Sequence, residues 1–323
     1  MKNITLIIPC YNEEDVIEAC YKSIKSVITI LPNYSFEILF VNDGSKDKTL
    51  EIIKDLRKKD STISYIDFSR NFGKEIALIA GLDYENSDAI VFMDADLQHP
   101  PEAIVEMVKW WEDGYDDVCV KRRERPGETW FKKWSSKTYY KVLNKLTRIP
   151  IQPGVGDFRL LDRKCVEALK LYRETQRYNK GLCSLIGFRK KEIVIDLNER
   201  LAGETKWNFF QLCNLAIEGI TSFTIAPLRV ASIIGSIFAI IAMIYMAYIV
   251  IKTLLLGGDL PGYPSLISVV LFIGGVQLLF LGIIGEYLGR VFNESKNRPL
   301  YLVNEFNDEK IVEQHYRRNY HDF

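Results

Sequence analysis

The apolar and polar positions of the first 120 residues predict strands and helices that follow one another in turn. Short apolar runs bounded by turn residues are typical of buried strands, and apolar residues at helical spacing predict amphipathic helices. The predicted strands are residues 4–9, 36–43, 63–68, 88–94 and 116–121, and the predicted helices are residues 13–31, 46–59, 74–85 and 101–114. This order favours an α/β fold with a mostly parallel sheet that carries helices on both faces.

After residue 121 this alternation stops. Residues 128–146 predict an amphipathic helix with aromatic and lysine side chains interleaved, 154–169 a turn, a short strand and a helix, and 188–200 a basic pair of strands. Residues 206–228 are bulky and apolar, with few charges. They predict either a helix of the globular core or amphipathic helices at a membrane surface, and the apolar segment that follows favours the membrane surface.

Two long segments near the C-terminus carry no charged residue: Val230 to Ile251 and Leu260 to Gly285. Each is long enough for a helix that crosses a bilayer. Buried core helices are the alternative, but two adjacent segments of this length argue against it. A short, glycine-rich connection predicts a hairpin of two transmembrane helices, at about residues 230–252 and 264–285, within a membrane region of residues 229–290.

Basic residues flank this hairpin on both sides: Arg229 before it, and Arg290, Lys296 and Arg298 after it. The positive-inside rule then places the globular part (1–205) and the C-terminal tail (291–323) in the cytoplasm. Lys252 is the exception, and its long side chain can reach the outer interface. The N-terminal apolar run is too short for a signal peptide and predicts a first strand.

Composition narrows the choice of partners and of compartment. Lys and Arg together number 42, as do Asp and Glu, so no excess of positive charge points to nucleic acid. The six cysteines form no CxxC pair, and with three histidines in the chain a zinc site is disfavoured. We therefore expect reduced cysteines in a reducing compartment.

Each of the first four predicted strands runs into a polar segment: "CYNEED", "NDGSKDKT", "SRNFGKE" and "DADLQHPPE". Ligands of parallel sheets bind beyond the carboxyl ends of the strands, so these segments predict one shared site. Asp94 and Asp96 point to one side at the end of the fourth strand. Mg²⁺ usually takes one or two carboxylates plus substrate phosphates. An acidic turn that starts the next helix is the alternative.

The turn after the second strand offers further polar groups. Asn42 and Asp43 present acceptors for a base or a ribose, and Ser45 or Asp47 can cap the helix that follows. Tyr11, after the first strand, is free to stack on a ring.

The motifs "IPCYNEE", "VNDGSKDKT", "FSRNFGKE" and "MDADLQHPPE", in this order and spacing, resemble inverting family-2 glycosyltransferases of the GT-A, Rossmann-like fold. Two further motifs, "NERLAGETKW" and "GEYLGRVFNESKNRPLY", are similar to membrane-bound polyprenyl-phosphate glycosyltransferases. That group includes the bactoprenol glucosyltransferases and, more distantly, dolichol-phosphate mannose synthase. The resemblance extends to about Val303, and the polar segment from Asn307 onward lies outside it.

The resemblance implies a role for each matching position. The base and ribose of a nucleotide sugar would be contacted by Pro9, Tyr11, Glu13 and Asp43. Its phosphates would lie near Arg70 and Lys74. Asp94, Asp96 and Gln98 would bind a Mg²⁺ or Mn²⁺ ion on the diphosphate. Asp157 would contact the sugar or the base. The acceptor phosphate would be bound by Arg122, Arg200 and Lys206. Alternative roles without a ligand remain open at several positions. Arg122 and Arg200 can be solvated charges, Asp157 a turn cap, and Glu75 a carboxylate in the first turn of a helix.

The implied reaction is transfer of a hexose, glucose from UDP-glucose, to undecaprenyl phosphate at the inner leaflet of the plasma membrane. A different nucleotide sugar is one alternative. A processive polysaccharide synthase is another, but its additional spans and its QxxRW motif are missing from the sequence. A non-catalytic membrane scaffold would be expected to have lost the paired aspartates. The resemblance also implies a homo-tetramer, and Gly274, Gly275, Gly282, Gly285 and Gly289 would allow close helix packing.

Overall fold

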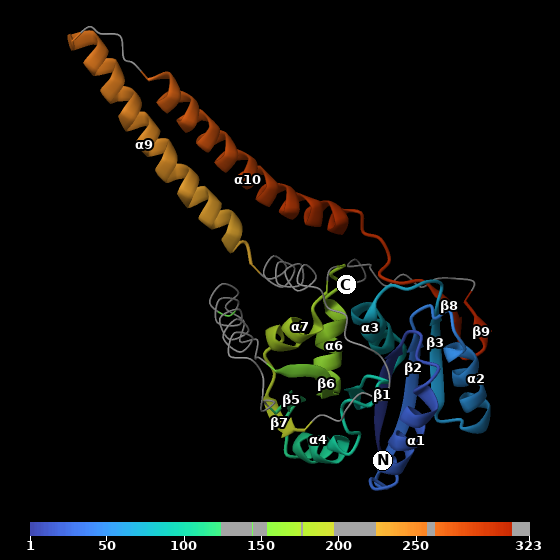
Figure 1. Cartoon of the computed structure of the whole chain (residues 1–323). Coiled ribbons are helices and arrows are strands. Elements are labelled where there is room, and N and C mark those ends of the chain that lie inside the picture. Colours follow the sequence, from blue (N-terminus) through green and yellow to red (C-terminus); the bar gives the residue numbers. More distant parts are fainter. Residues whose placement is uncertain (124–143, 145–153, 176, 197–223, 257–261, 312–323) are drawn as a thin grey trace, which may run out of the picture. The chain divides into compact units, whose positions relative to one another are not determined.

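A computed structural model describes most of the chain (Figure 1), and the described residues are 1–123, 144, 154–175, 177–196, 224–256 and 262–311. The chain forms two compact units. One contains Met1–Ala216 and Arg298–Phe323, and the other contains Ile217–Asn297. The predicted helix at 128–146, apart from residue 144, and most of the predicted amphipathic segment at 206–228 lie outside the described residues.

Nine strands of the described residues form one sheet in the first unit, in the order β7-β5-β6-β4-β1-β2-β3-β8-β9. Their bounds are β1 Lys2–Cys10, β2 Tyr34–Asn42, β3 Ile63–Phe68, β4 Ala89–Phe92, β5 Asp117–Arg122, β6 Val155–Asp162, β7 Lys190–Ile195, β8 Val303–Phe306 and β9 Glu309–Lys310. The centre, β4-β1-β2-β3, is parallel as predicted. The sheet as a whole is mixed, because β6 pairs antiparallel to β4 and β5, and β8 pairs antiparallel to β3.

The helices of this unit follow the predicted order: α1 Ile17–Ile28, α2 Thr49–Lys59, α3 Lys74–Tyr84, α4 Ala103–Glu112, α6 Arg163–Leu171 and α7 Asn179–Leu185. The prediction of four helices between the first strands is confirmed. The basic segment at 188–200 contributes β7, which pairs parallel to β5, and the rest of the predicted strand pair, from residue 197, lies outside the described residues. The short helix α7 was not predicted.

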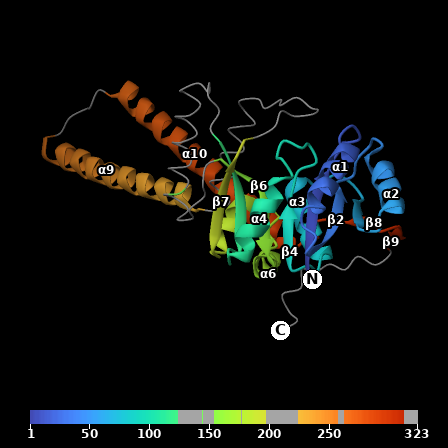
Figure 2. The ribbon, with the colours of Figure 1, turned by 90° about the horizontal axis from the view of Figure 1, so that it is seen from below.

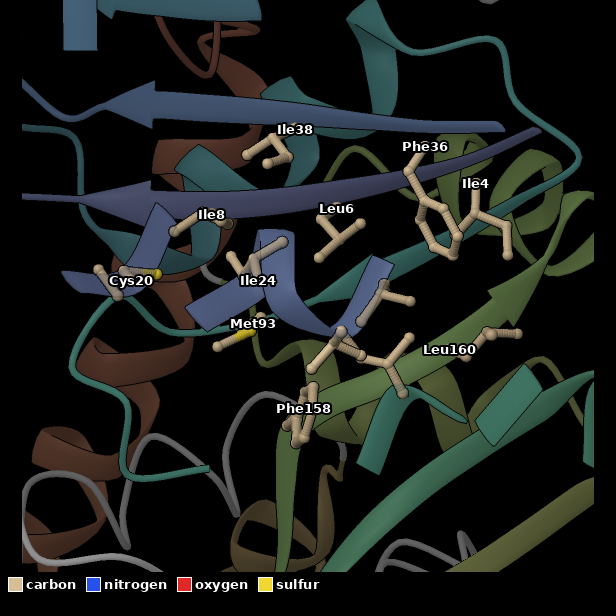
Figure 3. Packing of buried hydrophobic residues seen from close by; sticks show 14 of the residues in the cluster. Ile4, Leu6, Ile8, Cys20, Ile24, Phe36, Ile38, Met93, Phe158 and Leu160 are labelled. Atoms are coloured by element: carbon tan, nitrogen blue, oxygen red, sulfur yellow. The ribbon is translucent and has the colours of Figure 1, made fainter. Parts of the chain in front are cut away.

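Helices cover both faces of the sheet, and β1 shows why. Its side chains alternate between the two faces. Leu6 and Ile8 pack with Cys20 and Ile24 of α1 in the main core (Figure 3). Ile7 points to the other face, where a Cβ added to Gly81 of α3 would come within 2.3 Å of its side chain. A strand buried on both faces explains why residues 4–8 are apolar apart from Thr5, which is itself buried.

The second unit contains two long helices, α9 Ala226–Leu256 and α10 Tyr263–Ser295, which lie side by side as a hairpin (Figures 1 and 2). Phe238 and Phe272 meet edge to face with ring centroids 5.7 Å apart. Tyr287 donates a hydrogen bond of 2.6 Å to the carbonyl of Thr224. Both helices are long and apolar enough to cross a membrane. Their most apolar stretches are Leu228–Tyr245, which is 6% buried, and Phe272–Ser295, which is 0% buried. Such exposure argues against the alternative of buried core helices.

The chain after the hairpin adds two strands to the edge of the nine-stranded sheet. β8 pairs with β3, and β9 pairs with β8. Residues 303–310 had been assigned to a C-terminal tail of residues 291–323. The structure instead places them in the sheet, beside a strand that lies more than two hundred residues earlier in the sequence.

Candidate active site

The polar segments after β1, β2, β3 and β4 meet at one cleft of about 320 Å³. The four segments therefore lie together at one edge of the sheet, as the parallel strand order predicts. Seven of the predicted site residues line this cleft: Pro9, Tyr11, Glu13, Asp43, Lys74, Asp94 and Asp96. Cys10, Asn71, Gly73 and Ala95 complete its lining.

Side-chain hydrogen bonds join the loops after β1 and β2. Asn12 donates its backbone N–H to Ser45 Oγ (3.0 Å), and its Oδ1 accepts from the N–H of Lys46 (2.8 Å). The N–H of Glu13 donates to Thr49 Oγ1 (2.8 Å). Lys48 occupies the N-cap position of α2, and Asp47, one residue earlier, accepts the N–H of Thr49 at its Oδ1 (3.1 Å). These bonds fix one wall of the cleft.

Asp43 holds the opposite wall. Its two carboxylate oxygens accept the N–H groups of Phe72 (2.6 Å) and Gly73 (2.9 Å). Burial raises the pKa of Asp43, and the two N–H donors and Arg70 oppose that shift. The turn approaches so closely that a Cβ at Gly44 would lie 2.5 Å from the Arg70 carbonyl carbon, and Gly44 also has a positive φ of 67°. Asp43 thus shapes the cleft through its hydrogen bonds to the Phe72 and Gly73 backbone.

Lys74 joins two carboxylates that lie far apart in the sequence. Its Nζ lies 2.6 Å from Asp94 Oδ1 and 3.1 Å from Asp157 Oδ2. β4 and β6 pair antiparallel, with Phe92 opposite Arg159. Two residues further along, the same register places Asp94 opposite Asp157, which brings the two carboxylates together. Burial alone would raise the pKa of Asp157, but the charges of Lys74 and Lys180 outweigh it and lower that pKa.

The same partners act on Lys74 in return. Burial would lower its pKa, but the charges of Asp94 and Asp157 raise it above its ordinary value. The Lys74 ammonium therefore stays charged in the cleft. Lys74 and Asp157 are both predicted site residues, and their contact depends on the folded chain.

Two titratable groups lie close to this ion pair. Burial and the Asp157 carboxylate raise the pKa of Glu75 to about 7. Glu75 Oε2 also accepts the N–H of Asn179 (2.9 Å), so it does more than a first-turn helix carboxylate. His99 has no predicted role, and its ring packs on that of Phe158 with ring centroids 5.2 Å apart. Its Nδ1 is buried and has no hydrogen-bond partner among the described residues.

The remaining predicted residues lie around the cleft or outside the described part. Arg70 lines an adjoining cavity of about 700 Å³, which shares Tyr11 and Asn71 with the cleft. Gln98 donates its backbone N–H to Asp96 Oδ1 (3.0 Å). Arg122 ends β5, and its N–H donates to the Gly154 carbonyl (3.0 Å). Arg200 and Lys206 lie outside the described residues.

The donor set at Asp94 and Asp96 fits a hard divalent cation. Both residues line the cleft, and carboxylate oxygens are the ligands that Mg²⁺ prefers. Among the described residues, no group of three His, Cys, Asp or Glu side chains could hold a metal ion by itself. This arrangement suits a cation that completes its coordination with substrate phosphates.

Comparison with known proteins agrees with this geometry. Residues 5–170 match the model of glycosyl transferase family 2, and residues 226–291 match the GtrB C-terminal hairpin. An uncharacterized glycosyltransferase of Synechocystis is 48% identical over 302 residues, which cover 94% of this chain and 95% of the relative. The bactoprenol glucosyl transferase of Shigella phage SfV is 43% identical over 300 residues, covering 93% and 97%.

A putative glycosyltransferase of Bacillus subtilis is 44% identical over 304 residues, which cover 94% of this chain and 92% of that relative. The family match spans the strand ends that line the cleft, and the hairpin match spans α9 and most of α10. The chain belongs to glycosyl transferase family 2.

Proposed function

We propose that this protein transfers glucose from UDP-glucose to undecaprenyl phosphate at the cytoplasmic face of the plasma membrane. The observation that carries the proposal is a polar cleft at the strand ends of a family-2 catalytic domain, in a chain that also has an apolar helical hairpin. Relatives that match nearly the whole chain are named bactoprenol glucosyl transferases. The product would be a lipid-linked sugar for glycosylation of the cell envelope.

The reaction brings two anions together, and the charges of the cleft suit this task. A phosphate monoester has a second pKa of about 6, so the acceptor oxygen is already largely deprotonated at neutral pH. A strong general base is then not required. Positive charge and positioning are required, and Lys74 supplies a cation inside the cleft. Attack on the anomeric carbon from the side opposite the leaving UDP would invert its configuration.

A divalent cation would be held by Asp94 and Asp96, with Gln98 beside them. When bound, the cation supplies Lewis-acid stabilisation of the negative charge on the departing diphosphate. Lys74 Nζ lies 2.6 Å from Asp94 Oδ1, so the same ammonium would lie close to a phosphate oxygen of a diphosphate bound at that carboxylate. Asp157 holds Lys74 from the other side and orients it toward the cleft.

Membrane topology and assembly complete the proposal. Basic residues on both flanks of the hairpin favour a catalytic domain and two termini in the cytoplasm. At five α10 glycines, Gly274, Gly275, Gly282, Gly285 and Gly289, an added Cβ would have no atom within 4 Å among the described residues other than its own helix backbone. Open space beside these glycines leaves room for helices of other copies, which suits a homo-tetramer. Two spans per chain are few for a flipping pathway, so the enzyme would load the lipid and leave its translocation to another protein.

A donor screen tests the substrate assignment. Purified protein in detergent is incubated with undecaprenyl phosphate, Mg²⁺ and one nucleotide sugar at a time, and the lipid product is identified by mass spectrometry. A hexosyl-phosphoundecaprenol from UDP-glucose is the expected product. A product from GDP-mannose or UDP-N-acetylglucosamine alone would reassign the donor, and no product from any donor would refute the proposal.

A further inference from the structure

The segment that follows the membrane hairpin, residues 301–308, is fastened to β3 by backbone, side-chain and ring contacts. The N–H of Ser69 donates to the Leu302 carbonyl (3.0 Å). The N–H of Tyr65 donates to Asn307 Oδ1 (2.9 Å), and its hydroxyl donates to Asp308 Oδ1 (2.9 Å). Tyr301 stacks on Phe68 with ring centroids 5.3 Å apart. We call residues 301–308 the return segment.

One residue of the return segment reaches a buried carboxylate at the end of β3. Asn304 Nδ2 donates to Asp67 Oδ2 (2.9 Å), and Asn42 Nδ2 donates to Asp67 Oδ1 (2.6 Å). Asp67 is 5% exposed and Asn42 is 1% exposed. A buried carboxylate is costly unless it is hydrogen-bonded, so Asp67 depends on both amides. Asn304 therefore stabilises a contact that joins the ends of β2 and β3.

That contact continues into the cleft. Asn42 is the last residue of β2, and the next residue, Asp43, binds the N–H groups of Phe72 and Gly73 that form one wall. Asn304 and Asp67 also line the adjoining cavity of about 700 Å³ together with Asn71, which the two cavities share. A short series of hydrogen bonds thus links the return segment to the nucleotide side of the cleft.

We propose that Asn304 is a positioning residue for the nucleotide, acting through Asp67 and Asn42 on the Asp43 turn. The return segment is then part of the donor site, although it follows the membrane hairpin in sequence. This inference rests on the proposed function for the statement that the ligand is a nucleotide sugar. Its structural part, support of the 70–73 loop by Asn304, does not depend on that function.

A charge-swap cycle tests the inference. Asn304→Asp places a second carboxylate beside Asp67 and should raise the KM for UDP-glucose and the Kd for UDP with Mg²⁺ about tenfold, with kcat unchanged. In the double variant Asp67→Asn/Asn304→Asp, the amide at position 67 accepts from Asn42 and donates to the carboxylate at position 304. Both constants should return close to those of the parent.

Glu305→Gln is the matched control on the same strand. Glu305 lies opposite Asp67 in the sheet, but its side chain pairs with Lys54 at 2.8 Å and accepts from the Tyr65 hydroxyl. Its replacement therefore perturbs the return segment and keeps the hydrogen bonds of Asp67 to Asn304 and Asn42. It should lower the melting midpoint and leave UDP affinity unchanged. If Asn304→Asp behaves like Glu305→Gln, or if the double variant does not recover UDP affinity, the inference is overturned.

Hydrogen exchange separates this inference from the proposed function. In the intact protein without nucleotide, Asn304→Asp should speed exchange of the Phe72 and Gly73 amides, and the double variant should slow it again. A parent that makes no glucosyl lipid but shows this exchange pattern would refute the proposed function and keep the structural inference. Unchanged exchange in Asn304→Asp would refute the inference, whatever the parent transfers.

Discussion

Replacement of Arg159 by methionine tests whether a buried ion pair supports the active-site strand β6. The guanidinium of Arg159 donates from Nη1 to Asp117 Oδ2 (3.2 Å) and from Nη2 to the Gly156 carbonyl (3.1 Å). Gly156 immediately precedes Asp157. Methionine keeps much of the side-chain volume and removes both hydrogen bonds, so it leaves the Asp117 carboxylate buried without its cation.

The expected magnitude follows from burial. The side chains of Arg159 and Asp117 are both 2% exposed. Removing one partner of such a buried pair costs about 3–5 kcal/mol. For a unit of this size, each kcal/mol shifts the melting midpoint by about 2–4 °C, so Arg159→Met should lower it by about 6–20 °C. Asp117→Asn/Arg159→Met removes the uncompensated charge and should recover part of the loss.

Tryptophan fluorescence during heating measures this shift for the catalytic unit alone, because all five tryptophans lie within Met1–Ala216. Lys22→Ala is the control, since it breaks an ion pair with Glu18 whose side chains are 75% and 61% exposed. That change should cost no more than about 0.5 kcal/mol. A midpoint for Arg159→Met equal to that of Lys22→Ala would refute the assignment of β6 support to the buried pair.

Three further predictions concern the cleft. Asp96→Asn should lower turnover by at least about 100-fold and abolish the Mg²⁺ dependence of UDP binding measured by calorimetry, and unchanged turnover would contradict the metal assignment. Glu75, with its pKa raised to about 7, binds a proton in the folded state that the unfolded chain releases near pH 4.5. Its stabilising contribution is therefore complete below about pH 4.5 and is lost as the pH rises to about 7. Glu75→Gln should flatten the fall in melting midpoint between pH 5 and pH 7.5, and parallel curves for the two proteins would contradict this. Arg122→Ala should raise the KM for undecaprenyl phosphate about tenfold and leave the affinity for UDP unchanged, because the Arg122 guanidinium would contact only the acceptor phosphate. An equal loss of UDP affinity would assign Arg122 to the donor site.

The centre of the fold could be predicted from sequence because its signals are local. Apolar runs such as Ala89–Phe92 and the helical spacing of α1 and α2 lie within single elements, and the polar segments after them follow directly. Parallel strands then bring those segments to one edge of the sheet. The cleft at Tyr11, Asp43 and Asp94 is the result.

The parts that escaped prediction depend on pairing between distant segments. β8 is short, and it becomes a strand because its backbone pairs with the free edge of β3. The Lys74–Asp157 contact depends on the antiparallel register of β6 on β4, which no local pattern encodes. The same holds for Asn304, whose partner Asp67 lies in a strand formed near the start of the chain.

Transfer of radiolabelled glucose from UDP-glucose to undecaprenyl phosphate tests the central claim most directly. The account predicts label in a chloroform-extractable, mild-acid-labile lipid, dependent on a divalent cation and lost in Asp96→Asn. Folded protein that binds UDP with Mg²⁺ but moves no label to this acceptor would contradict it.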